Sequence, residues 1–390
     1  MGKPYSMDLR ERVVRRVEAG ESCRSVARVF DLGEATVIRW LCTMVGYPEQ
    51  SGGFLASGGS IANLSAVVTA RSERLPEDFL RGTIYAADQV HHSIGKAARL
   101  AGFPRGNLRA VPVDGDYRMR IDALHDAIRR DRAAGRQPFL LVGSAGTTNT
   151  GAVDDLATLA DVAEAEQLWF HIDAAYGGFF MLTARGRSVM RGIERADSIT
   201  MDPHKGLFLP YGTGCLLARD VAALVRTHRV DADYMLAREQ TDEFVSMCDI
   251  SPELSRGFRG LRVWLPLKLH GAGPFRDALN EKLDLAQWAA EELERIPGIE
   301  IVAQPQLSTV AFCLTRPGID RAAHDRLNRE LLQRINRRQR VNLTGTVLDR
   351  GFVLRICVLS HRTHLDRLQL GLEDIRGSVA ELATDGSFDP

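Results

Sequence analysis

Short apolar runs alternate with amphipathic stretches of helical length from Val37 onward, and this alternation constrains the fold of the 390-residue chain more than any other feature. It predicts an α/β fold, in which a mostly parallel sheet has helices on both faces. In such folds ligands bind beyond the carboxyl ends of the strands, so the residues that follow each apolar run are the candidate functional residues. The runs include RGTIYAAD, PFLLVGSAG, QLWFHIDAAY and DSITMD.

Three parts are expected along the chain. Residues 1–40 have the outline of a helix-turn-helix, and residues 41–270 carry the alternating pattern of the large domain. Residues 271–390 begin with a long helical pattern and continue with the apolar runs IEIVAQ, STVAFCLT and FVLRICVL, which predicts a smaller C-terminal α+β domain. The helical patterns of the first part are Asp8–Glu18, Ser22–Phe30 and Glu34–Trp40.

Composition narrows the classes of protein to which the chain can belong. Fifty Lys and Arg residues balance fifty Asp and Glu residues, so no global basic field points to nucleic acid or to an acidic membrane. The six cysteines form no CxxC pair, which argues against a zinc site and against a disulfide framework. Neither a secretory signal nor a stretch of membrane-spanning length is present. We therefore expect a cytoplasmic protein with reduced thiols, no metal and no membrane association.

A glycine-rich turn precedes the first long helical pattern of the large domain. Ser57, Gly58, Gly59 and Ser60 lead directly into IANLSAVV. Small residues at a helix N-terminus leave backbone N–H groups open to a phosphate, although the same sequence also forms ordinary loops and caps.

Two polar clusters follow other apolar runs. His91 lies in DQVHHSIGKA, after TIYAA, where an imidazole could stack on a planar cofactor, polarise a carboxylate or simply cap a helix. Thr147 and Thr148 follow LLVGSA, where their hydroxyls could reach a phenolate oxygen of a cofactor or merely close a turn. From the residues alone, a cofactor-binding role and a purely structural role stay open for each cluster.

An aspartate and a lysine carry the strongest chemical signal. Asp173 follows the apolar run WFHI, and a carboxylate at a buried strand end needs a strong partner, such as a protonated pyridine nitrogen. Ala175 is small enough to let a ring lie against the backbone. Lys205, in Asp-Pro-His-Lys after the run DSITM, can form a Schiff base with an aldehyde if a neighbouring cationic ring lowers its pKa. The alternative for Lys205 is a surface lysine in a turn.

Residues 37 to about 380 resemble the group II pyridoxal-phosphate (PLP)-dependent amino acid decarboxylases, the family of the aromatic-L-amino-acid and glutamate enzymes. The resemblance implies the type I, aspartate aminotransferase-like fold of PLP-dependent transferases, and a homodimer with the active site at the subunit interface. It rests on ordered motifs, namely VIRWLCTMVGYP, FLASGGSIANL, DQVHHSIGKAA, GTTNTGAVDD, WFHIDAAYGG, GIERADSITMDPHKGLFLPYGTG and LSRGFRGLRVWLPLKLHG.

The resemblance also implies roles for individual residues. Gly59 and Ser60 would hold the cofactor phosphate, and Thr147 or Thr148 would lie near the ring hydroxyl. The implied catalytic residues are Lys205, which binds the cofactor aldehyde, His91, which stacks on the ring, and Asp173, which pairs with the ring nitrogen. The full expected set of cofactor contacts is Gly59, Ser60, His91, Thr148, Asp173, Ala175, Asp202, His204 and Lys205.

The implied reaction is decarboxylation of an L-amino acid to an amine and carbon dioxide, and the motifs favour an aromatic substrate. Two departures from the family bear on this reaction, the first through cofactor binding and the second through the acid that protonates the product. Asp202 stands where many members have Asn, and its carboxylate would repel the phosphate unless it turned away. Met247 falls where the mobile loop of the family carries a tyrosine that acts as an acid, with Tyr234 the nearest upstream tyrosine. The alternatives are an aminotransferase or an aldehyde-forming oxidase.

Residues 1–40 resemble the N-terminal DNA-binding module of insertion-sequence transposases. This module stands where the decarboxylases carry a helical segment that wraps the partner subunit, so the decarboxylase homology is expected to be truncated. DNA binding by residues 1–40 is one interpretation, and a plain packing unit is the other. An inactive decarboxylase remnant fused to a DNA-binding module, or a remnant that folds poorly, is the corresponding alternative for the whole chain.

Overall fold

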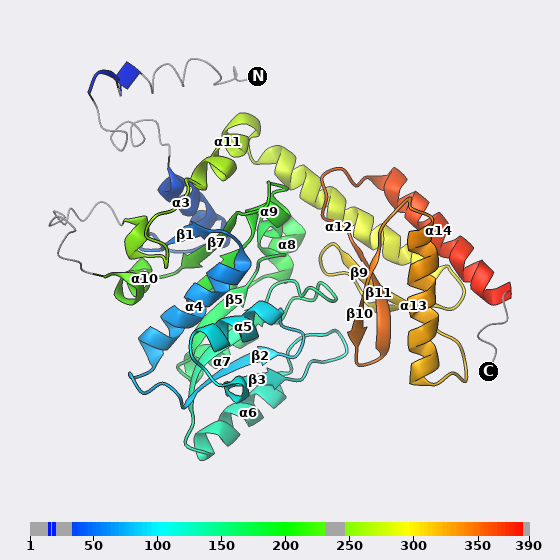
Figure 1. Ribbon diagram of the computed structural model, residues 1–390, viewed down its shortest axis with the longest axis horizontal. Helices are drawn as coiled ribbons and strands as arrows, with labels where there is room; N and C mark the ends of the chain where they lie inside the picture. Colours follow the sequence, from blue (N-terminus) through cyan, green and yellow to red (C-terminus); the bar gives the residue numbers. More distant parts are fainter. Residues whose placement is uncertain (1–14, 17, 21–32, 231–245, 385–390) are drawn as a thin grey trace.

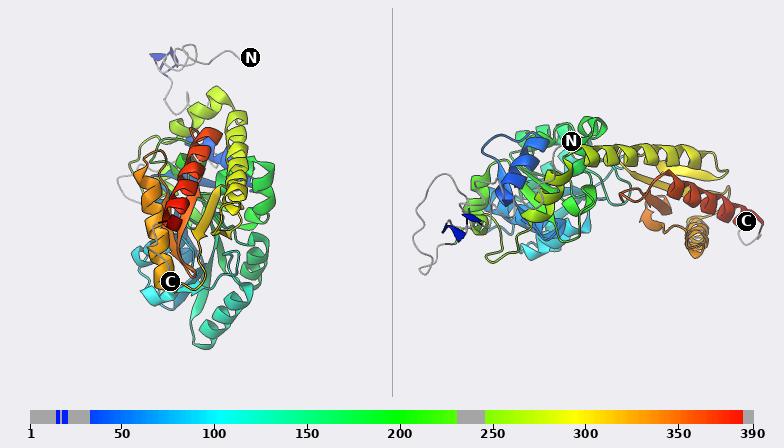
Figure 2. Two further views of the ribbon diagram at one scale, coloured as in Figure 1. Left: turned by 90° about the vertical axis from the view of Figure 1, so that its right-hand side faces the viewer. Right: turned by 90° about the horizontal axis from the view of Figure 1, so that it is seen from above.

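The computed structural model describes residues 15–16, 18–20, 33–230 and 246–384. A seven-stranded sheet forms the centre of the larger part, and a four-stranded sheet lies in the smaller C-terminal part (Figure 1). The two parts lie side by side in all three ribbon views, with one long helix running between them (Figures 1 and 2).

The large sheet is mostly parallel, as the apolar runs predict. Its strand order is β1-β7-β6-β5-β4-β2-β3; β7 is antiparallel to both of its neighbours, β1 and β6, and the other neighbouring pairs are parallel. All four runs quoted above form strands of this sheet, so the expected α/β fold is confirmed. The strands are β1 (Gly52–Ala56), β2 (Gly82–Ala87), β3 (Leu108–Val111), β4 (Gln137–Ser144), β5 (Trp169–Asp173), β6 (Ser198–Met201) and β7 (Gly214–Ala218).

Both faces of the large sheet are covered, because side chains alternate between two hydrophobic cores. Ile84 and Ala86 of β2 belong to the core under α4 and α5. Tyr85 and Ala87 belong to the core on the other face, which α6 and α7 cover. The helices of the large part after the first strand are α4 (Gly59–Arg74), α5 (His92–Leu100), α6 (Ile121–Ala133), α7 (Leu156–Ala165), α8 (Ala184–Val189), α9 (Pro203–Gly206) and α10 (Val221–His228).

Helix α3 (Glu34–Val45) joins the core of the large part and crosses the expected domain limit at residue 40. Val37 and Ile38, which fall within the expected N-terminal part, are both buried in the main core. The sequence pattern was ambiguous because an amphipathic helix presents the same apolar face to either partner. The limits 1–40, 41–270 and 271–390 stay predictions. The expected helices Asp8–Glu18 and Ser22–Phe30 lie largely or wholly outside the described residues.

A buried ion pair fixes the first turn of α3. Glu34 Oε1 accepts hydrogen bonds from Arg256 Nη2 at 2.8 Å and from the backbone N–H of Leu55 at 2.6 Å. The side chains of Glu34 and Arg256 are only 7% and 9% exposed. This contact joins the beginning of the described enzyme domain to a segment more than 200 residues later in the chain.

The smaller part is a four-stranded antiparallel sheet of order β10-β11-β9-β8, with helices on one face. Its other face contacts the large part, where Val353 and Ala311 share a core with Tyr117 and Ala152. The elements that follow α10 are α11 (Gly260–His270), α12 (Gly273–Glu294), β8 (Ile299–Ala303), β9 (Thr309–Leu314), α13 (Arg321–Arg337), β10 (Thr344–Leu348), β11 (Gly351–Cys357) and α14 (Leu365–Thr384). Short 3-10 helices are η1 (Arg105–Asn107), η2 (Gly178–Leu182), η3 (Ile193–Arg195) and η4 (Met247–Asp249).

Helix α12 belongs to both hydrophobic cores. Its residues Leu279 and Leu283 lie in the core of the large part, whereas Leu285 and Leu293 lie in the core of the smaller part. The helix is 22 residues long, which corresponds to about 33 Å. It therefore connects the two sheets without a break.

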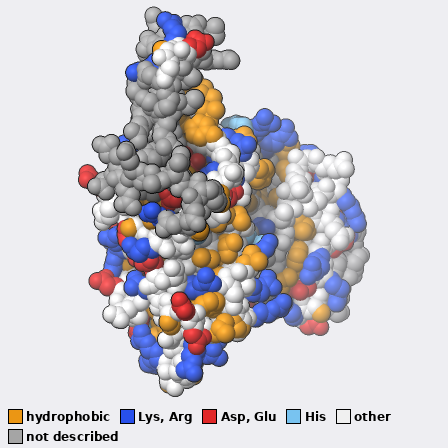
Figure 3. All heavy atoms as spheres, turned by 60° about the vertical axis from the view of Figure 1, so that its left-hand side comes forward, with side chains coloured by type: hydrophobic (Ala, Val, Ile, Leu, Met, Phe, Trp, Pro, Cys, Tyr) orange, Lys and Arg blue, Asp and Glu red, His pale blue; other side chains and the backbone are white. Residues whose placement is uncertain are grey.

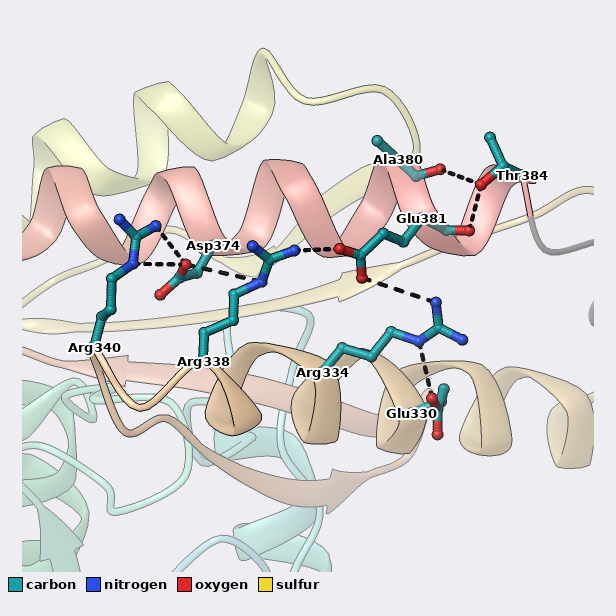
Figure 4. Close-up of polar contacts among 8 residues, drawn as sticks. All are labelled: Glu330, Arg334, Arg338, Arg340, Asp374, Ala380, Glu381 and Thr384. Atoms are coloured by element: carbon teal, nitrogen blue, oxygen red, sulfur yellow. Dashed lines mark hydrogen bonds and ion pairs between the residues drawn. The ribbon is translucent and has the colours of Figure 1, made fainter.

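Charged side chains line the contact between α14 and the segment around the end of α13 (Figure 4). Arg340 Nε donates to Asp374 Oδ1 at 3.0 Å, and Arg338 forms an ion pair with Glu381. Asp374 is fully buried, so its carboxylate depends on these arginines for charge compensation.

Among the described residues, no helix combines the length and the apolar character needed to cross a membrane.

Candidate active site

A cavity of about 360 Å³ opens at the carboxyl ends of β4, β5 and β6. All nine residues expected to contact a cofactor line it, together with neighbours that the sequence did not single out. Each expected residue lies at the end of a strand or in the turn or helix start that follows one, which is where an open α/β sheet places its functional groups. The nine are Gly59, Ser60, His91, Thr148, Asp173, Ala175, Asp202, His204 and Lys205.

Asp173 is the last residue of β5, and its carboxylate is held in place by two hydrogen bonds. The backbone N–H of Ala175 donates to Oδ1 at 3.1 Å, and Asn63 Nδ2 donates to Oδ2 at 2.9 Å. Asp173 is only 8% exposed. The carboxylate is therefore shielded, oriented and available to a cation inside the cavity.

Asn63 of α4 hydrogen-bonds to several residues of the site, and it was not among the residues predicted from the sequence. Its Nδ2 also donates to Ser93 Oγ at 2.9 Å, and its Oδ1 lies 3.0 Å from His171 Nε2. Asn63 is 1% exposed, so these bonds form away from water. The only signal in the sequence was its place in the motif FLASGGSIANL, because its partners lie from 30 to 110 residues away.

His91 caps the start of α5 and faces the same network. Its Nδ1 lies 2.7 Å from Ser93 Oγ and accepts from the Ser93 backbone N–H at 3.3 Å. Burial lowers the pKa of His91 below its ordinary value, and the nearby Asp173 opposes that shift. A mainly neutral imidazole is suited to stacking on a flat ring.

The glycine-rich turn forms the wall of the cavity at the start of α4. Gly58 is the N-cap of this helix and Gly59 is its first residue, so the first backbone N–H groups lack partners within the helix. A Cβ at Gly59 would lie 3.0 Å from Asp202 Oδ2 and 3.3 Å from Ala175 Cβ. The absence of a side chain at Gly59 thus allows close approach of the turn to the ends of β5 and β6.

Lys205 reaches the cavity from α9 and forms an ion pair with Asp202. The distance between Lys205 Nζ and Asp202 Oδ2 is 3.0 Å. The Lys205 side chain is 36% exposed, whereas that of Asp202 is 3% exposed. His204 lies next to them, with Nδ1 2.6 Å from the carbonyl oxygen of Thr213.

The two threonines after β4 differ in whether their side chains are available to contact a ligand in the cavity. The Thr147 hydroxyl lies 2.8 Å from Thr150 Oγ1 and accepts from the Ala152 backbone N–H at 3.2 Å, so it closes the turn. Thr148 is exposed and lines the cavity. Arg355 of β11 donates to its carbonyl oxygen, which ties this wall to the smaller part.

Two tyrosines also line the cavity without having been predicted. Tyr176 follows β5, and its hydroxyl lies 2.7 Å from Ser308 Oγ of the smaller part. Tyr211 is 87% exposed, and its ring centroid is 5.3 Å from that of His204. Met247 does not line the cavity but packs against the hydrophobic cluster that contains Phe54 and Leu224. Tyr234 lies outside the described residues.

The donor set of the cavity fits a phosphorylated pyridine aldehyde. Asp173 offers an oriented carboxylate for a ring nitrogen, and Lys205 offers an amine for an aldehyde. The turn at Gly59 offers backbone N–H groups for a phosphate, and His91 offers a flat ring. The residues therefore fit PLP.

Comparisons with known families agree with this geometry. The family described as "Pyridoxal-dependent decarboxylase conserved domain" matches residues 27–315. A second family, described as "Transposase", matches residues 3–45, in agreement with the resemblance of the N-terminal segment. The two matches overlap, and α3 lies entirely within the overlap.

Similar proteins are decarboxylases. The chain is 35% identical over 354 residues to the aromatic-L-amino-acid decarboxylase of Bacillus atrophaeus, covering 90% of this chain and 73% of the relative. It is 30% identical over 349 residues to tryptophan decarboxylase 2 of Oryza sativa subsp. japonica, covering 85% of this chain and 70% of the relative.

Solved structures show the same fold. Oryza sativa TDC in a crystal structure with PLP and tryptamine superposes with a TM-score of 0.84 at 28% identity, covering 90% of this chain and 76% of that one. Rhodiola rosea 4-hydroxyphenylacetaldehyde synthase superposes with a TM-score of 0.82 at 26% identity, covering 90% of this chain and 75% of that one. The fold is thus that of the type I PLP-dependent enzymes. The chain belongs to the pyridoxal-dependent decarboxylase family, and its chemistry is PLP-dependent decarboxylation of an amino acid.

Proposed function

We propose that this chain decarboxylates an aromatic L-amino acid to the corresponding amine, with Lys205 as the residue that binds the cofactor. The observation that carries the proposal is the convergence of all nine expected residues on one cavity. Two features support an aromatic substrate. The similar proteins named above include aromatic-L-amino-acid and tryptophan decarboxylases, and the cavity is lined by the rings of Tyr176 and Tyr211.

The chain's own residues would bind and orient the cofactor. PLP, when bound, supplies an electron sink for the pair of electrons left by the departing carboxylate. Asp173 would hold a proton on the ring nitrogen, because its carboxylate is already fixed by Asn63 and by the Ala175 backbone. His91 would stack on the ring, Ser60 and Gly59 would bind the phosphate, and Thr148 would approach the ring hydroxyl. Ala175 and His204 would complete the contacts.

Formation of an amine requires a proton at the former carboxylate-bearing carbon, and the cavity must exclude oxygen from that carbon. Tyr211 and His204 lie at the wall that also carries Lys205, and both carry a transferable proton. Product analysis separates amine formation from the aldehyde-forming and transaminating alternatives. Incubation with L-tryptophan, L-tyrosine or L-phenylalanine should yield one equivalent of amine for each carbon dioxide. An aldehyde or a keto acid as the main product would overturn the proposed reaction.

The experiment that tests the role of Lys205 is a visible absorption titration with PLP. Parent protein should develop the absorption band of a lysine-bound cofactor, and Lys205→Ala should not. Lys96→Ala is the matched control, because Lys96 lies exposed on α5 and does not line the cavity. A band that persists in Lys205→Ala would refute the assignment.

We also propose that the protein is a homodimer. Three leucines spaced by four residues on α11, Leu261, Leu265 and Leu269, are 45%, 42% and 49% exposed. In Figure 3, hydrophobic side chains are exposed near the top of the molecule, at the level where Figure 1 draws α11. Burial of such a stripe against a second subunit would be favourable. Sedimentation velocity should give the mass of a dimer, and Leu265→Asp should shift it toward the monomer.

A cytoplasmic location is part of the same proposal, and it is supported by Cys42, Cys215 and Cys313, which are buried as free thiols.

DNA binding by residues 1–40 is a second candidate function, supported by the transposase-family match to residues 3–45. An electrophoretic shift with duplex DNA at rising salt tests it. Binding through phosphate contacts should weaken steeply with salt, and the lack of any shift at low salt would refute it.

A further inference from the structure

Asp202 occupies an unusual position for a carboxylate. It follows β6 and lies between the glycine-rich turn and β7, where Cβ atoms at Gly59 and Gly214 would come within 3.0 Å and 2.6 Å of its oxygens. Its Oδ2 contacts Lys205 Nζ at 3.0 Å. Its Oδ1 is buried and has no hydrogen-bond partner among the described residues. The carboxylate thus has one strong partner, and that partner is the amine proposed to bind the cofactor.

The surroundings favour the neutral form of Asp202 once Lys205 stops compensating its charge. Burial raises the pKa of Asp202, while Lys205 and His204 act in the opposite direction. The negative charge of Asp173 on β5 adds to the effect of burial. The ionisable groups that face Asp202 from the elements around it are Lys205 and His204 on α9, Asp173 on β5, Cys215 on β7 and His91 at the start of α5.

Entry of the cofactor changes both halves of this ion pair. An ammonium group has no lone pair, so Lys205 must lose a proton before its nitrogen can attack an aldehyde. A phosphate at the Gly59 turn brings negative charge next to the Asp202 carboxylate, which disfavours its ionised form. The proton that must leave Lys205 and the proton that Asp202 then requires can be the same one.

We propose that Asp202 accepts a proton from Lys205 when the cofactor enters and retains it while the cofactor stays bound. In this step one N–H bond of the Lys205 ammonium breaks and one O–H bond forms at Asp202 Oδ2. The nitrogen keeps the electron pair, which makes it a nucleophile, and the carboxyl group becomes neutral. Asp202 thereby activates Lys205 and removes the charge repulsion with the phosphate. The two hydrogens that remain on the nitrogen leave with the aldehyde oxygen as one water molecule when the bond between Lys205 and the aldehyde carbon forms, so the transfer itself needs no proton from solvent.

This inference rests on the proposed role of Lys205, and a proton count on cofactor binding tests it separately. Parent protein and Asp202→Asn are titrated with PLP near neutral pH in weak buffer containing a pH indicator, and the visible band reports binding in the same cuvette. Asn cannot take the proton, so with the cofactor bound the variant holds one proton fewer than the parent. The variant should therefore release about one proton more per bound cofactor than the parent does.

Asp197→Asn is the matched control, since Asp197 directly precedes β6 and is partly buried, but it does not line the cavity. It should release as many protons as the parent. Equal release by parent and Asp202→Asn, with the band present in both, would overturn the inference and leave the role of Lys205 intact. Absence of the band from the parent would overturn both.

A second measurement needs no variant. Infrared difference spectra of the parent, recorded with and without PLP, should gain the stretching band of a protonated carboxyl group, which shifts in ²H₂O. Loss of carboxylate absorption should accompany it. If the cofactor binds and no protonated carboxyl band appears, Asp202 remains ionised and the inference fails.

Discussion

Asn63 on α4 and Asp173 on β5 are joined by a hydrogen bond of 2.9 Å in the interior of the cavity wall, although 110 residues separate them in the chain. The bond orients the carboxylate that is proposed to hold the ring nitrogen of PLP.

Asn63→Ala removes this bond and leaves Asp173 less firmly oriented. A lost hydrogen bond to a charged group amounts to about 1.5–3 kcal/mol, so the dissociation constant of PLP should rise at least about tenfold. Titration of the visible band measures this. Asn107→Ala is the control, because Asn107 is equally buried but bonds to the carbonyl oxygens of Leu80 and Gly82, away from the cavity. An unchanged dissociation constant in Asn63→Ala would show that Asp173 needs no such support.

Asp173→Asn should separate cofactor binding from turnover. Lys205 is untouched, so the visible band should still form. The ring nitrogen loses the carboxylate that keeps it protonated, and amine formation should fall by about 100-fold or more. The measurement is the rate of amine release at saturating PLP. Turnover at the parent rate would refute the electrostatic role of Asp173.

Stability should fall in mild acid because of His171. Burial lowers the pKa of His171 to about 4, whereas a histidine in an unfolded chain titrates near 6.5. Between these pH values the unfolded chain binds more protons, so the free energy of unfolding rises with pH. The contribution of His171 is complete above about pH 6.5, and about 3 kcal/mol of it is lost as the pH falls to about 4.

His171→Gln tests this dependence, since glutamine does not titrate. Urea unfolding at several pH values should show a smaller loss of stability between pH 6.5 and 4 in the variant than in the parent. His228, whose pKa burial also lowers to about 4, contributes equally in both proteins. His270→Gln, an exposed position on α11, should keep the parent slope. Identical slopes in His171→Gln and parent would contradict the prediction.

Arg256→Ala should destabilise the fold strongly. It leaves the Glu34 carboxylate buried and without its charged partner, which costs about 3–5 kcal/mol. Arg226→Ala removes an exposed pair with Glu73 and should cost at most about 1 kcal/mol. Urea unfolding at neutral pH compares the two. Similar losses in both variants would mean that α3 is not anchored through Glu34.

Much of the fold follows from local patterns. The apolar runs before Asp173 and Asp202 form β5 and β6 because their side chains are buried on both faces of a parallel sheet. Once these strands are parallel neighbours, the residues after them must meet, and the convergence of Asp173 and Lys205 follows. A sequence pattern is enough for that step.

Other features depend on contacts between distant parts of the chain. The direction of β7 is set by its pairing with β1, which precedes it by about 160 residues, and no local pattern encodes that. Asn63 bonds to three residues on two other elements, α5 and β5, and a single polar residue in a helix gives no sign of them. The side on which α3 packs was ambiguous for the same reason, because its partner Arg256 lies far away.

Helix α12 has a mechanical consequence for the whole molecule. One uninterrupted helix contributes leucines to both hydrophobic cores, so a rotation of one sheet against the other would have to bend the helix or pull leucines out of one core. The hydroxyl contact between Tyr176 and Ser308 opposes the same movement at the cavity. We therefore expect the two parts to unfold together in a single cooperative transition, since a continuous helix and not a flexible linker spans the boundary between them.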